Sequence, residues 1–335
     1  MPADHASLPH PSLCITVIGG GLIGASWAAL FLAHGHEVVV HDVAPEVETR
    51  VRQVLRQAQP GLEALGLSLD PGTPRLRVEP SLASAVRLAD WVQECGPERL
   101  GFKQQLWAEV EQQCRADAVL ASSSSGITAS MQAARMRTPE RMLIAHPFNP
   151  PHLIPLVELV PGKRTAPDTL QRARVFCESL GKRVVVLRKE IPGFVANRIQ
   201  AAVIRESVSL VRQGVVSAED LDVAVTQSLG LRWAVGGPFL SAHLGGGPGG
   251  IQGFFKQFAG GLQLLWLHMR LRPVLLTRSA REALADEVLA TYGATGIDAL
   301  AAHRDAQQNA VLRALRTPSE ALPRPSSPSL SQESP

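Results

Sequence analysis

The sequence has little that would place it in a membrane, in an oxidising compartment or on a nucleic acid. Its four cysteines are widely spaced without a C-x-x-C pair, so we interpret them as free thiols and expect no metal site. Lys and Arg number 33 against 30 Asp and Glu, and their scatter predicts no nucleic-acid partner. Arg or Gly interrupts the apolar stretches before they could cross a bilayer. Residues 1–12 lack the basic and apolar parts of a signal peptide, and we expect a cytoplasmic protein.

A glycine-rich turn lies near the start of the chain. The apolar run 13–18, rich in β-branched residues, predicts a buried strand. Gly19, Gly21 and Gly24 follow it in G-x-G-x-x-G spacing, which serves a tight turn, close approach of backbone to a pyrophosphate, and close packing of helix on strand. The spacing alone is weak evidence, because an unrelated α/β protein can contain a glycine-rich turn. The ordered set of strand, glycines, helix, strand and acid is much stronger evidence for a dinucleotide site.

The residues after the glycines complete this pattern. A helix that begins at Leu22 and Ile23 would offer unpaired N–H groups and a positive dipole end to phosphates. A second strand, 38–41, ends at Asp42, which lies 18 residues beyond the last glycine of the motif. A carboxylate there can accept hydrogen bonds from ribose hydroxyls and would repel a 2′-phosphate. We therefore predict NAD, rather than NADP, as the cofactor.

The alternation of strands and helices predicts two domains. The 335 residues, 45% of them hydrophobic, are enough for two cores. We expect an α/β fold in which a Rossmann-type NAD-binding domain with a mostly parallel sheet, 13–190, is followed by an all-α domain, 191–316. The segment KEIPG marks the boundary, because no strand pattern follows it. The Pro- and Ser-rich ends, 1–12 and 317–335, are expected to be disordered.

Four consecutive serines, Ser122–Ser125, follow a predicted strand over 118–121. Such a run is most often a polar turn. It also puts hydroxyls at the carboxyl end of a strand, where open α/β sheets bind their ligands. The sequence alone leaves both interpretations open.

His146 and Glu158 lie twelve positions apart, and a strand–loop–strand return can bring them side by side. An imidazole can take a hydroxyl proton near neutral pH while hydride leaves the carbon. A carboxylate on the other ring nitrogen would fix the tautomer and stabilise the imidazolium. The alternative is a buried histidine that is satisfied by a backbone carbonyl, and we prefer that interpretation for His152 and His243.

These features together resemble the L-3-hydroxyacyl-CoA dehydrogenase family over about residues 13–315. The most specific segment, IAHPFNPPHLIPLVELV, is similar to the family pattern H-F-F-N-P…L-V-E, and GFVANRIQ at 193–200 supports it. Within the family, the chain resembles the branch that acts on small free hydroxy acids, which includes lambda-crystallin (L-gulonate 3-dehydrogenase) and L-carnitine dehydrogenase. The closer likeness lies in three segments: AHPFNPPHLIPLVELVPG, QECGPERLGFK and RWAVGGPFLSAHL.

The resemblance implies roles for individual residues. It makes His146 the general base and Glu158 its orienting partner. Ser124 matches the serine that hydrogen-bonds the reacting 3-oxygen, with Ser125 as the alternative because the serine run is one residue out of step. Asn197 matches the asparagine near the substrate carbonyl.

Other positions match less completely. Glu98 and Lys103 lie where the family has polar contacts on the cofactor side. Pro147 stands where the acyl-CoA enzymes have an aromatic residue, and Gly126 replaces a larger residue after the serines. Both departures argue against a CoA substrate and leave the chemistry unchanged.

The resemblance thus implies an NAD-dependent oxidoreductase that converts the 3-hydroxyl of a small L-3-hydroxy acid (L-gulonate, L-carnitine or 3-hydroxybutyrate type) to the 3-keto acid, without a metal. One alternative is an enzyme acting on CoA thioesters. A second is a β-hydroxyacid dehydrogenase with a lysine base, but the helix predicted at 194–212 offers Arg198 and Arg205 and no lysine. A third is a non-enzymatic crystallin-like or NAD-sensing protein.

The helical half raises two further expectations. The family pairs its second domains, so a homodimer is implied, and the apolar stretch Leu262–Leu267 is one candidate for that surface. The same stretch would serve equally well in the core of a monomer. Arg232 and Trp233 are candidates to contact the far end of the substrate, an anion or a cation respectively, or else they are packing residues.

Overall fold

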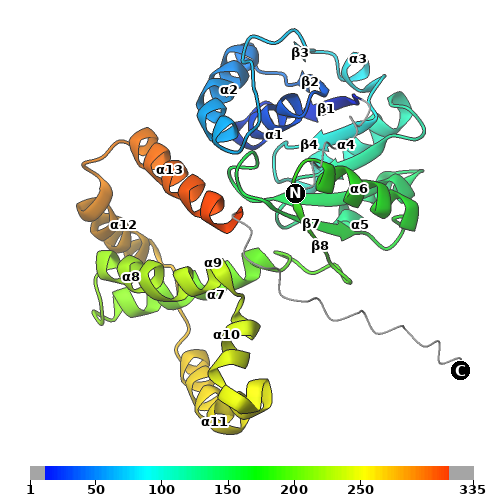
Figure 1. Ribbon diagram of the computed structural model, residues 1–335. Helices are drawn as coiled ribbons and strands as arrows, with labels where there is room; N and C mark the ends of the chain where they lie inside the picture. Colours follow the sequence, from blue (N-terminus) through cyan, green and yellow to red (C-terminus); the bar gives the residue numbers. More distant parts are fainter. Residues whose placement is uncertain (1–11, 317–335) are drawn as a thin grey trace, which may run out of the picture.

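The computed structural model describes residues 12–316 (Figure 1), so the disorder predicted for the two ends lies almost wholly outside the described residues. The first half of the chain builds one twisted sheet of eight strands in the order β3-β2-β1-β4-β5-β6-β7-β8. The strands are β1 (Cys14–Ile18), β2 (Glu37–His41), β3 (Leu76–Val78), β4 (Trp91–Glu94), β5 (Val119–Ser122), β6 (Met142–Pro147), β7 (Leu156–Pro161) and β8 (Arg183–Val186).

The neighbouring strands run parallel except at one place. The pair of β6 and β7 is antiparallel, which leaves β7 and β8 parallel to each other and opposite to the rest. The strand order reverses between β1 and β4, which are adjacent and parallel although two strands separate them in the sequence. In open α/β sheets, the carboxyl ends of the strands at such a reversal form the ligand-binding crevice.

Helices cover both faces of the sheet, and strand alternation divides the core between them. Ile15 and Val17 of β1 belong to one apolar cluster, with Trp27 of α1 and Phe176 of α6. Ile18 belongs to the other, together with α3, α4 and α5. This is the period-2 alternation of a strand buried on both faces. The helices are α1 (Leu22–Ala33), α2 (Val47–Ala64), α3 (Leu82–Val86), α4 (Leu100–Gln113), α5 (Ala129–Gln132) and α6 (Pro167–Ser179).

The second half of the chain is helical. Figure 1 shows α10 and α11 far from the sheet, whereas α13 returns to lie beside α2. At that contact Arg313 donates a hydrogen bond from Nε to the carbonyl of Ala64. The helices are α7 (Ala196–Arg212), α8 (Ala218–Ala224), α9 (Leu231–Val235), α10 (Pro238–Gly245), α11 (Gly250–Leu271), α12 (Arg278–Tyr292) and α13 (Ile297–Arg316), with a π-helical turn (Val225–Gly230) before α9.

The helical half leaves most of its large apolar side chains exposed. Among the described residues after Phe194, the buried apolar side chains are Val211, Ala218 and Ala280. On α11, Leu264 is 71% exposed and Trp266 is 60% exposed. A single chain therefore gives these helices almost no core of their own. Within the part of the chain that the structure describes, no helix is both long and apolar enough to span a membrane.

The predicted fold class is confirmed. A Rossmann-type, mostly parallel sheet is followed by helices, and β8 is the last strand of the sheet. Ser81 caps α3 by accepting from the N–H of Ser84, and Ser217 caps α8 by accepting from the N–H of Asp220. One start differs from the prediction: the helix expected from Phe194 begins at Ala196, because Phe194 has a positive φ of 50° that a helix does not allow.

Candidate active site

The residues singled out in the sequence gather at the carboxyl edge of the sheet. Gly19 follows β1, Glu98 follows β4, Ser124 follows β5 and His146 lies near the end of β6. These four strands are adjacent and parallel, so their carboxyl ends meet at one edge. That edge includes the reversal of strand order between β1 and β4, the position at which such sheets bind ligands.

His146 and Glu158 form a buried pair. The antiparallel register of β6 and β7 sets the two residues directly opposite each other, and His146 Nδ1 lies 2.8 Å from Glu158 Oε2. Both side chains are buried. A carboxylate beside Nδ1 favours the tautomer with the proton on Nδ1, which leaves Nε2 free to accept one. The strand return predicted from the sequence thus brings the two side chains together.

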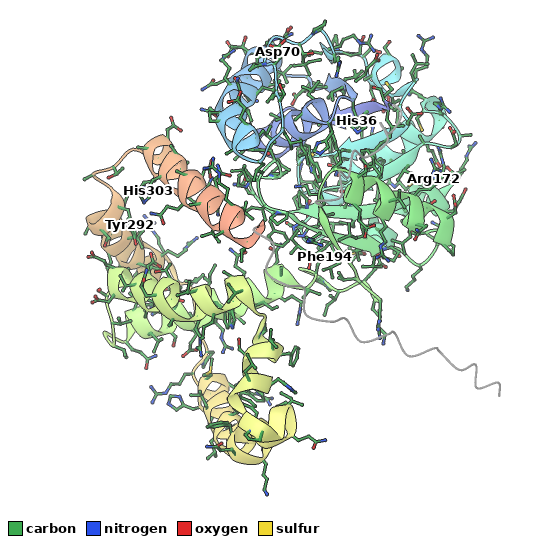
Figure 2. All side chains as sticks on the ribbon, in the orientation of Figure 1. His36, Asp70, Arg172, Phe194, Tyr292 and His303 are labelled. Atoms are coloured by element: carbon green, nitrogen blue, oxygen red, sulfur yellow. The ribbon has the colours of Figure 1, made fainter. Side chains whose placement is uncertain are left out.

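Two aromatic rings pack against the imidazole of His146, in addition to its contact with Glu158. The ring of Phe148 meets it edge-on, with 4.9 Å between centroids, and the ring of Phe194 lies 5.3 Å away at a tilt. Phe194 is fully buried at the junction between the sheet and α7, where Figure 2 labels it. Neither phenylalanine was singled out in the sequence, although both stand in the segments HPFNPP and GFVANR that carried the resemblance.

The second oxygen of Glu158 anchors α7. Oε1 accepts hydrogen bonds from the N–H groups of Val195 and Ala196, each at 3.0 Å. Burial by itself would raise the pKa of Glu158. The hydrogen bonds from His146, Ala196 and Val195 outweigh it and hold the pKa below its ordinary value, so the group is ionised at neutral pH.

Asn197 lies in the first turn of α7, next to the residues that Glu158 holds. Its side chain is half-buried, and no hydrogen bond to it is found within residues 12–316. Glu158 therefore fixes the position of the imidazole and also the helix end that bears this carboxamide. The four residues predicted to be catalytic come from β6, β7, α7 and the turn after β5.

The first two serines of the run support the edge of the sheet. Ser122 donates a hydrogen bond from Oγ to Glu94 Oε2 at 2.5 Å, in a buried environment. Ser123 Oγ accepts from the indole N–H of Trp27 at 3.2 Å and from Gln93 Nε2 at 2.8 Å. For these two residues, the structural interpretation of the serine run is the correct one.

Ser124 has a different environment from Ser125. Its hydroxyl is buried and donates to Glu98 Oε1 at 2.5 Å, whereas Ser125 is exposed. The N–H groups of Gly126 and Ile127 also reach Glu98 Oε1, at 3.0 and 3.2 Å. Of the two serines considered as substrate contacts, Ser124 is the one with a fixed hydroxyl.

The strand register relates Ser124 to the histidine. Ser122 pairs with Ile144 across β5 and β6. Ser124 and His146 each lie two residues further along, so they occupy corresponding positions at the ends of neighbouring parallel strands. A substrate hydroxyl at this edge would have both groups on one side.

Glu98 and Lys103 lie on the β4 side of the same edge. Burial would raise the pKa of Glu98, but the hydrogen bond from Ser124 and the charge of Lys103 hold it below the ordinary value. Lys103 is 1% exposed, and its ammonium lies 2.7 Å from Glu94 Oε1 and 3.4 Å from Glu98 Oε2. Its direct contact with a cofactor stays a prediction. A small cleft of about 120 Å³ is lined here by Ile23, Glu98, Lys103, Ser124 and Ser125, among others.

Glu94, which was not predicted as a site residue, accepts hydrogen bonds from Lys103 and Ser122 beneath this cleft. The signal was a charged residue in the otherwise buried strand DWVQE. His152 is buried, as expected, and its Nδ1 is 2.7 Å from Ser26 Oγ on α1. Its partner is thus a hydroxyl rather than a backbone carbonyl.

The glycine turn has the shape that a dinucleotide requires. Gly19 has a φ of 100°, and a Cβ there would lie 2.7 Å from the carbonyl oxygen of Cys95. A Cβ at Gly24 would lie 1.9 Å from the carbonyl oxygen of Gly19, so only glycine allows α1 to pack this closely. Gly21 precedes α1, and apart from its chain neighbours no atom of residues 12–316 lies within 4 Å of its Cβ position. Its N-cap position carries no side-chain hydrogen bond. The free N–H groups and open approach fit a pyrophosphate.

Asp42 lies beside this turn at the end of β2. Its Oδ2 accepts from the N–H of Gly20 at 2.7 Å, and its Oδ1 accepts from the N–H of Ala44 at 2.9 Å. The residue as a whole is half-buried. Leu22 begins α1 and is 58% exposed beside the turn. The residues fit NAD, and Asp42 shapes the glycine turn as well.

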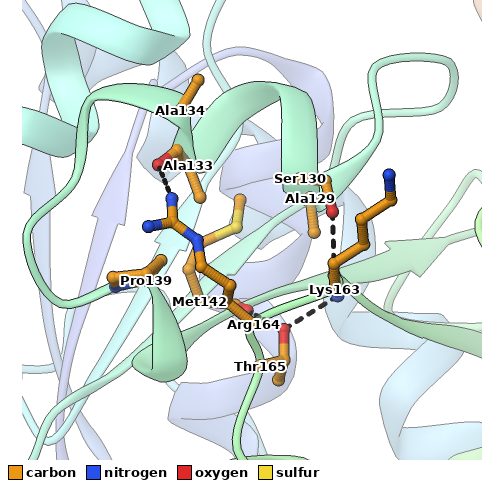
Figure 3. A pocket seen from close by; sticks show the side chains of 10 residues that line it. Ala129, Ser130, Ala133, Ala134, Pro139, Met142, Lys163, Arg164 and Thr165 are labelled. Atoms are coloured by element: carbon orange, nitrogen blue, oxygen red, sulfur yellow. Dashed lines mark hydrogen bonds between the residues drawn. The ribbon is translucent and has the colours of Figure 1, made fainter.

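A separate hollow of about 360 Å³ lies away from this edge (Figure 3). Met142 in its wall begins β6, whereas His146 lies near the other end of that strand. Its two hydroxyls already have partners: Ser130 Oγ accepts from the N–H of Lys163, and Thr165 Oγ1 donates to the carbonyl of Met142. It shares no lining residue with the cleft beside Ser124.

Comparison with known proteins agrees with this geometry. The family model described as 3-hydroxyacyl-CoA dehydrogenase, NAD binding domain, matches residues 14–191, and that of the C-terminal domain matches residues 193–280. The chain is 40% identical over 318 residues to an L-carnitine dehydrogenase of Nocardiopsis dassonvillei, covering 94% of this chain and 95% of that protein. It is 40% identical over 300 residues to an L-carnitine dehydrogenase of a Pseudomonas species, covering 90% and 93%.

The chain is also similar to solved structures of dehydrogenases. A 5-formyl-3-hydroxy-2-methylpyridine 4-carboxylic acid 5-dehydrogenase, described as an NAD⁺-dependent dismutase, is 31% identical with a TM-score of 0.77, covering 92% of this chain and 100% of that one. A 3-hydroxyacyl-CoA dehydrogenase of Archaeoglobus fulgidus is 27% identical with a TM-score of 0.59, covering 90% and 99%. Both resemble the chain through most of its length.

Proposed function

The chain belongs to the 3-hydroxyacyl-CoA dehydrogenase family, and we propose that this NAD-dependent dehydrogenase oxidises the 3-hydroxyl of a small free L-3-hydroxy acid to the 3-keto acid. The observation that carries the proposal is the buried hydrogen bond between His146 Nδ1 and Glu158 Oε2 at the carboxyl edge of the sheet. L-Carnitine is the first substrate to test, because the relatives matched over most of their length are L-carnitine dehydrogenases.

The proposed reaction moves one proton and one hydride. His146 Nε2 takes the hydroxyl proton, and Glu158 stabilises the resulting imidazolium through Nδ1. NAD bound at the glycine turn would supply the acceptor for the hydride of C3, and the alcohol would become a ketone. Ser124 donates to the reacting oxygen in place of Glu98, and Asn197 binds the carbonyl side of the substrate. The imidazolium then returns its proton to water.

Residues at the glycine turn are proposed to hold the cofactor. Gly19, Gly21 and Gly24 form the cradle, and the start of α1, at Leu22 and Ile23, lies along the pyrophosphate. The Asp42 carboxylate is proposed to accept hydrogen bonds from the ribose hydroxyls. Glu98, with Lys103 behind it, lies toward the nicotinamide end.

Other members of the proposed substrate class remain to be separated from L-carnitine. L-Gulonate and 3-hydroxybutyrate also present a 3-hydroxyl and a carboxylate. A CoA thioester is the second candidate, because the family name contains it, but Pro147 and Gly126 argue against it. A crystallin-like or NAD-sensing role would leave Ser124, His146 and Asn197 without use.

We also propose a homodimer formed through the helical half, within a cytoplasmic protein of two domains, 13–190 and 191–316. The support is the exposed apolar surface of α11, where the side chains of Leu264, Trp266 and Leu267 are all more than half exposed. Helices that bury so few apolar side chains within one chain need a permanent partner to cover the rest, and we propose that a second copy of this chain covers them.

The test is NADH formation by purified protein on L-carnitine, L-gulonate, L-3-hydroxybutyrate and its CoA thioester, each with NAD and with NADP. We expect NAD-dependent turnover of a free acid, with L-carnitine first, and a turnover lower by about 10²–10⁴-fold in the variant His146→Ala. Turnover of the thioester alone would move the protein to the CoA branch. No turnover on any compound, with NAD binding intact, would contradict the proposed substrate class.

A further inference from the structure

A buried lysine, Lys182, lies between α6 and β8, outside the predicted site. Its Nζ donates hydrogen bonds to the carbonyls of Pro151 and Ile154, the latter at 2.9 Å. The ammonium also lies over the ring of Trp27, 5.4 Å from its centre. No carboxylate pairs with it in the described part of the chain. Burying a cation without a counter-ion is costly, so core stability alone does not account for a lysine here.

The two carbonyls belong to residues 148–155, the segment that joins β6 to β7 and therefore joins His146 to Glu158 in the chain. At its start, Phe148 meets the imidazole edge-on. In its middle, His152 is tied to Ser26 of α1 through Nδ1 at 2.7 Å and through its N–H at 3.1 Å. Lys182 binds carbonyls on both sides of His152. It therefore fixes the same part of the segment that the hydrogen bonds between His152 and Ser26 fix.

Trp27 extends this connection to the serines. One face of its indole receives the ammonium of Lys182, and its N–H donates to Ser123 Oγ. Ser123 immediately precedes Ser124. Lys182, which precedes the edge strand β8, thus contacts both the segment 148–155 and helix α1, whose Trp27 binds Ser123.

We infer that Lys182 is a positioning residue that sets the segment 148–155, and through Phe148 the ring of His146, by binding the carbonyls of Pro151 and Ile154. The catalytic consequence rests on the proposed function, because it requires His146 to be the base. The order of the segment does not depend on it and can be measured without any substrate.

The charge of Lys182 adds a pH dependence. Burial lowers its pKa to about 7, and the neighbouring Cys177 opposes that shift only in part. A neutral amine still donates, but without the charge assistance to the carbonyls or the attraction to the indole face. The segment is therefore held most tightly below that pKa and loosens as the pH rises through it.

The histidine and cysteine neighbours of Lys182 are uncharged near neutrality, whereas the charged side chains of Arg174, Glu178 and Arg183 line the same pocket as Lys182. Burial lowers the pKa of His34 at the end of α1. It also lowers the pKa of His152, to about 4, and the charge of Lys182 contributes to both shifts. Burial raises the pKa of Cys177 on α6 to about 12. The charged groups that act on these neighbours come from α6 and α13: Glu178, Arg304 and Asp305.

Amide hydrogen exchange of a peptide that spans 148–155 tests the inference. Lys182→Met should raise the exchange of this peptide about tenfold, whereas Lys182→Arg should retain most of its protection. Arg183→Met is the matched control, because Arg183 is the exposed cation next in the chain, and it should exchange like the wild type. In the wild type, protection corrected for intrinsic rates should fall as the pH rises through about 7, and in Lys182→Arg it should not.

Kinetics complete the test where the wild type turns over a substrate. Lys182→Met should lower kcat about tenfold or more with little change in the dissociation constant of NAD, because the glycine turn is untouched. Wild-type exchange of 148–155 in Lys182→Met would overturn the inference, and so would an equal rise in peptides from α2. A wild type that is inactive on every compound would contradict the proposed function alone, since exchange still reports on the segment.

Discussion

The carboxylate of Glu158 accepts the N–H of Ala196 at 3.0 Å, and the same group faces His146 with its other oxygen. One side chain therefore joins the sheet to the first helix of the second half. The two oxygens have separate tasks, because Oε2 orients the imidazole and Oε1 fixes the helix end that carries Asn197. A change at Glu158 should affect both.

Glu158→Gln should lower kcat/KM by about 10²-fold, because a neutral amide stabilises an imidazolium poorly. It should also raise the KM of the hydroxy acid, since the amide binds the N–H groups of Val195 and Ala196 less well than a carboxylate does. Steady-state kinetics on the best substrate of the panel measure both. Glu140→Gln, at an exposed position beyond the site, is the control. Unchanged kinetics in Glu158→Gln would remove the carboxylate from the proposed mechanism.

His146→Ala should lower kcat by about 10²–10⁴-fold, the range that a positioned general base supplies. The dissociation constant of NAD, measured by fluorescence titration, should stay within about twofold, because the dinucleotide residues lie on β1, α1 and β2. His152→Gln is a useful companion, since it removes a buried histidine of the same segment that is hydrogen-bonded to Ser26 instead of Glu158. A smaller loss in His146→Ala than in His152→Gln would refute the assignment of the base.

Asp42→Ala should relax the preference for NAD over NADP, because the carboxylate no longer repels a 2′-phosphate. The structure adds a second effect. Asp42 also accepts the N–H groups of Gly20 and Ala44, so the variant should bind NAD itself more weakly. The ratio of kcat/KM for the two cofactors checks the first effect, and NAD titration checks the second. Unchanged discrimination would show that Asp42 does not face the ribose.

The sequence was most informative where chemistry and backbone geometry coincide. Gly19 and Gly24 leave no room for a Cβ, so their spacing predicts the turn directly. His146 and Glu158 were predictable as a pair because a return between antiparallel strands imposes their register. The predicted roles of all these residues still await the measurements above.

Contacts between segments that are distant in the chain could not be predicted from the sequence. Glu94 and Lys103 meet beneath the cleft only because α4 packs over the end of β4. Lys182 reaches Pro151 and Ile154 only once β7 and β8 lie together. Neither contact follows from periodicity or from a motif, because each depends on how two elements are placed in space.

Trp266→Glu should dissociate the proposed homodimer, because it puts a charge into the exposed apolar face of α11. Sedimentation of the variant should give a monomer where the wild type gives a dimer, with a lowered melting temperature. Leu88→Glu is the matched control: Leu88 is 56% exposed, similar to the 60% of Trp266, but it lies on the sheet half. A wild type that sediments as a monomer would contradict the homodimer.

His152 should make the free energy of unfolding fall in mild acid. Burial lowers its pKa from 6.5 to about 4, so between these values the unfolded chain binds a proton that the native protein excludes. Stability must then fall as the pH drops through 6.5 toward 4, by about 3 kcal/mol for this group alone.

Glu98 and Glu158 also have lowered pKa values, but their contributions are lost only as the pH falls below the ordinary value of 4.5. The upper part of the window therefore belongs to the two histidines whose pKa burial lowers, His152 and His34. Urea unfolding at a series of pH values should show a shallower loss of stability in His152→Gln than in the wild type. His268→Gln, at an exposed position on α11, is the matched control and should follow the wild type. Equal slopes for wild type and His152→Gln would mean that the native protein protonates this imidazole as readily as the unfolded chain does.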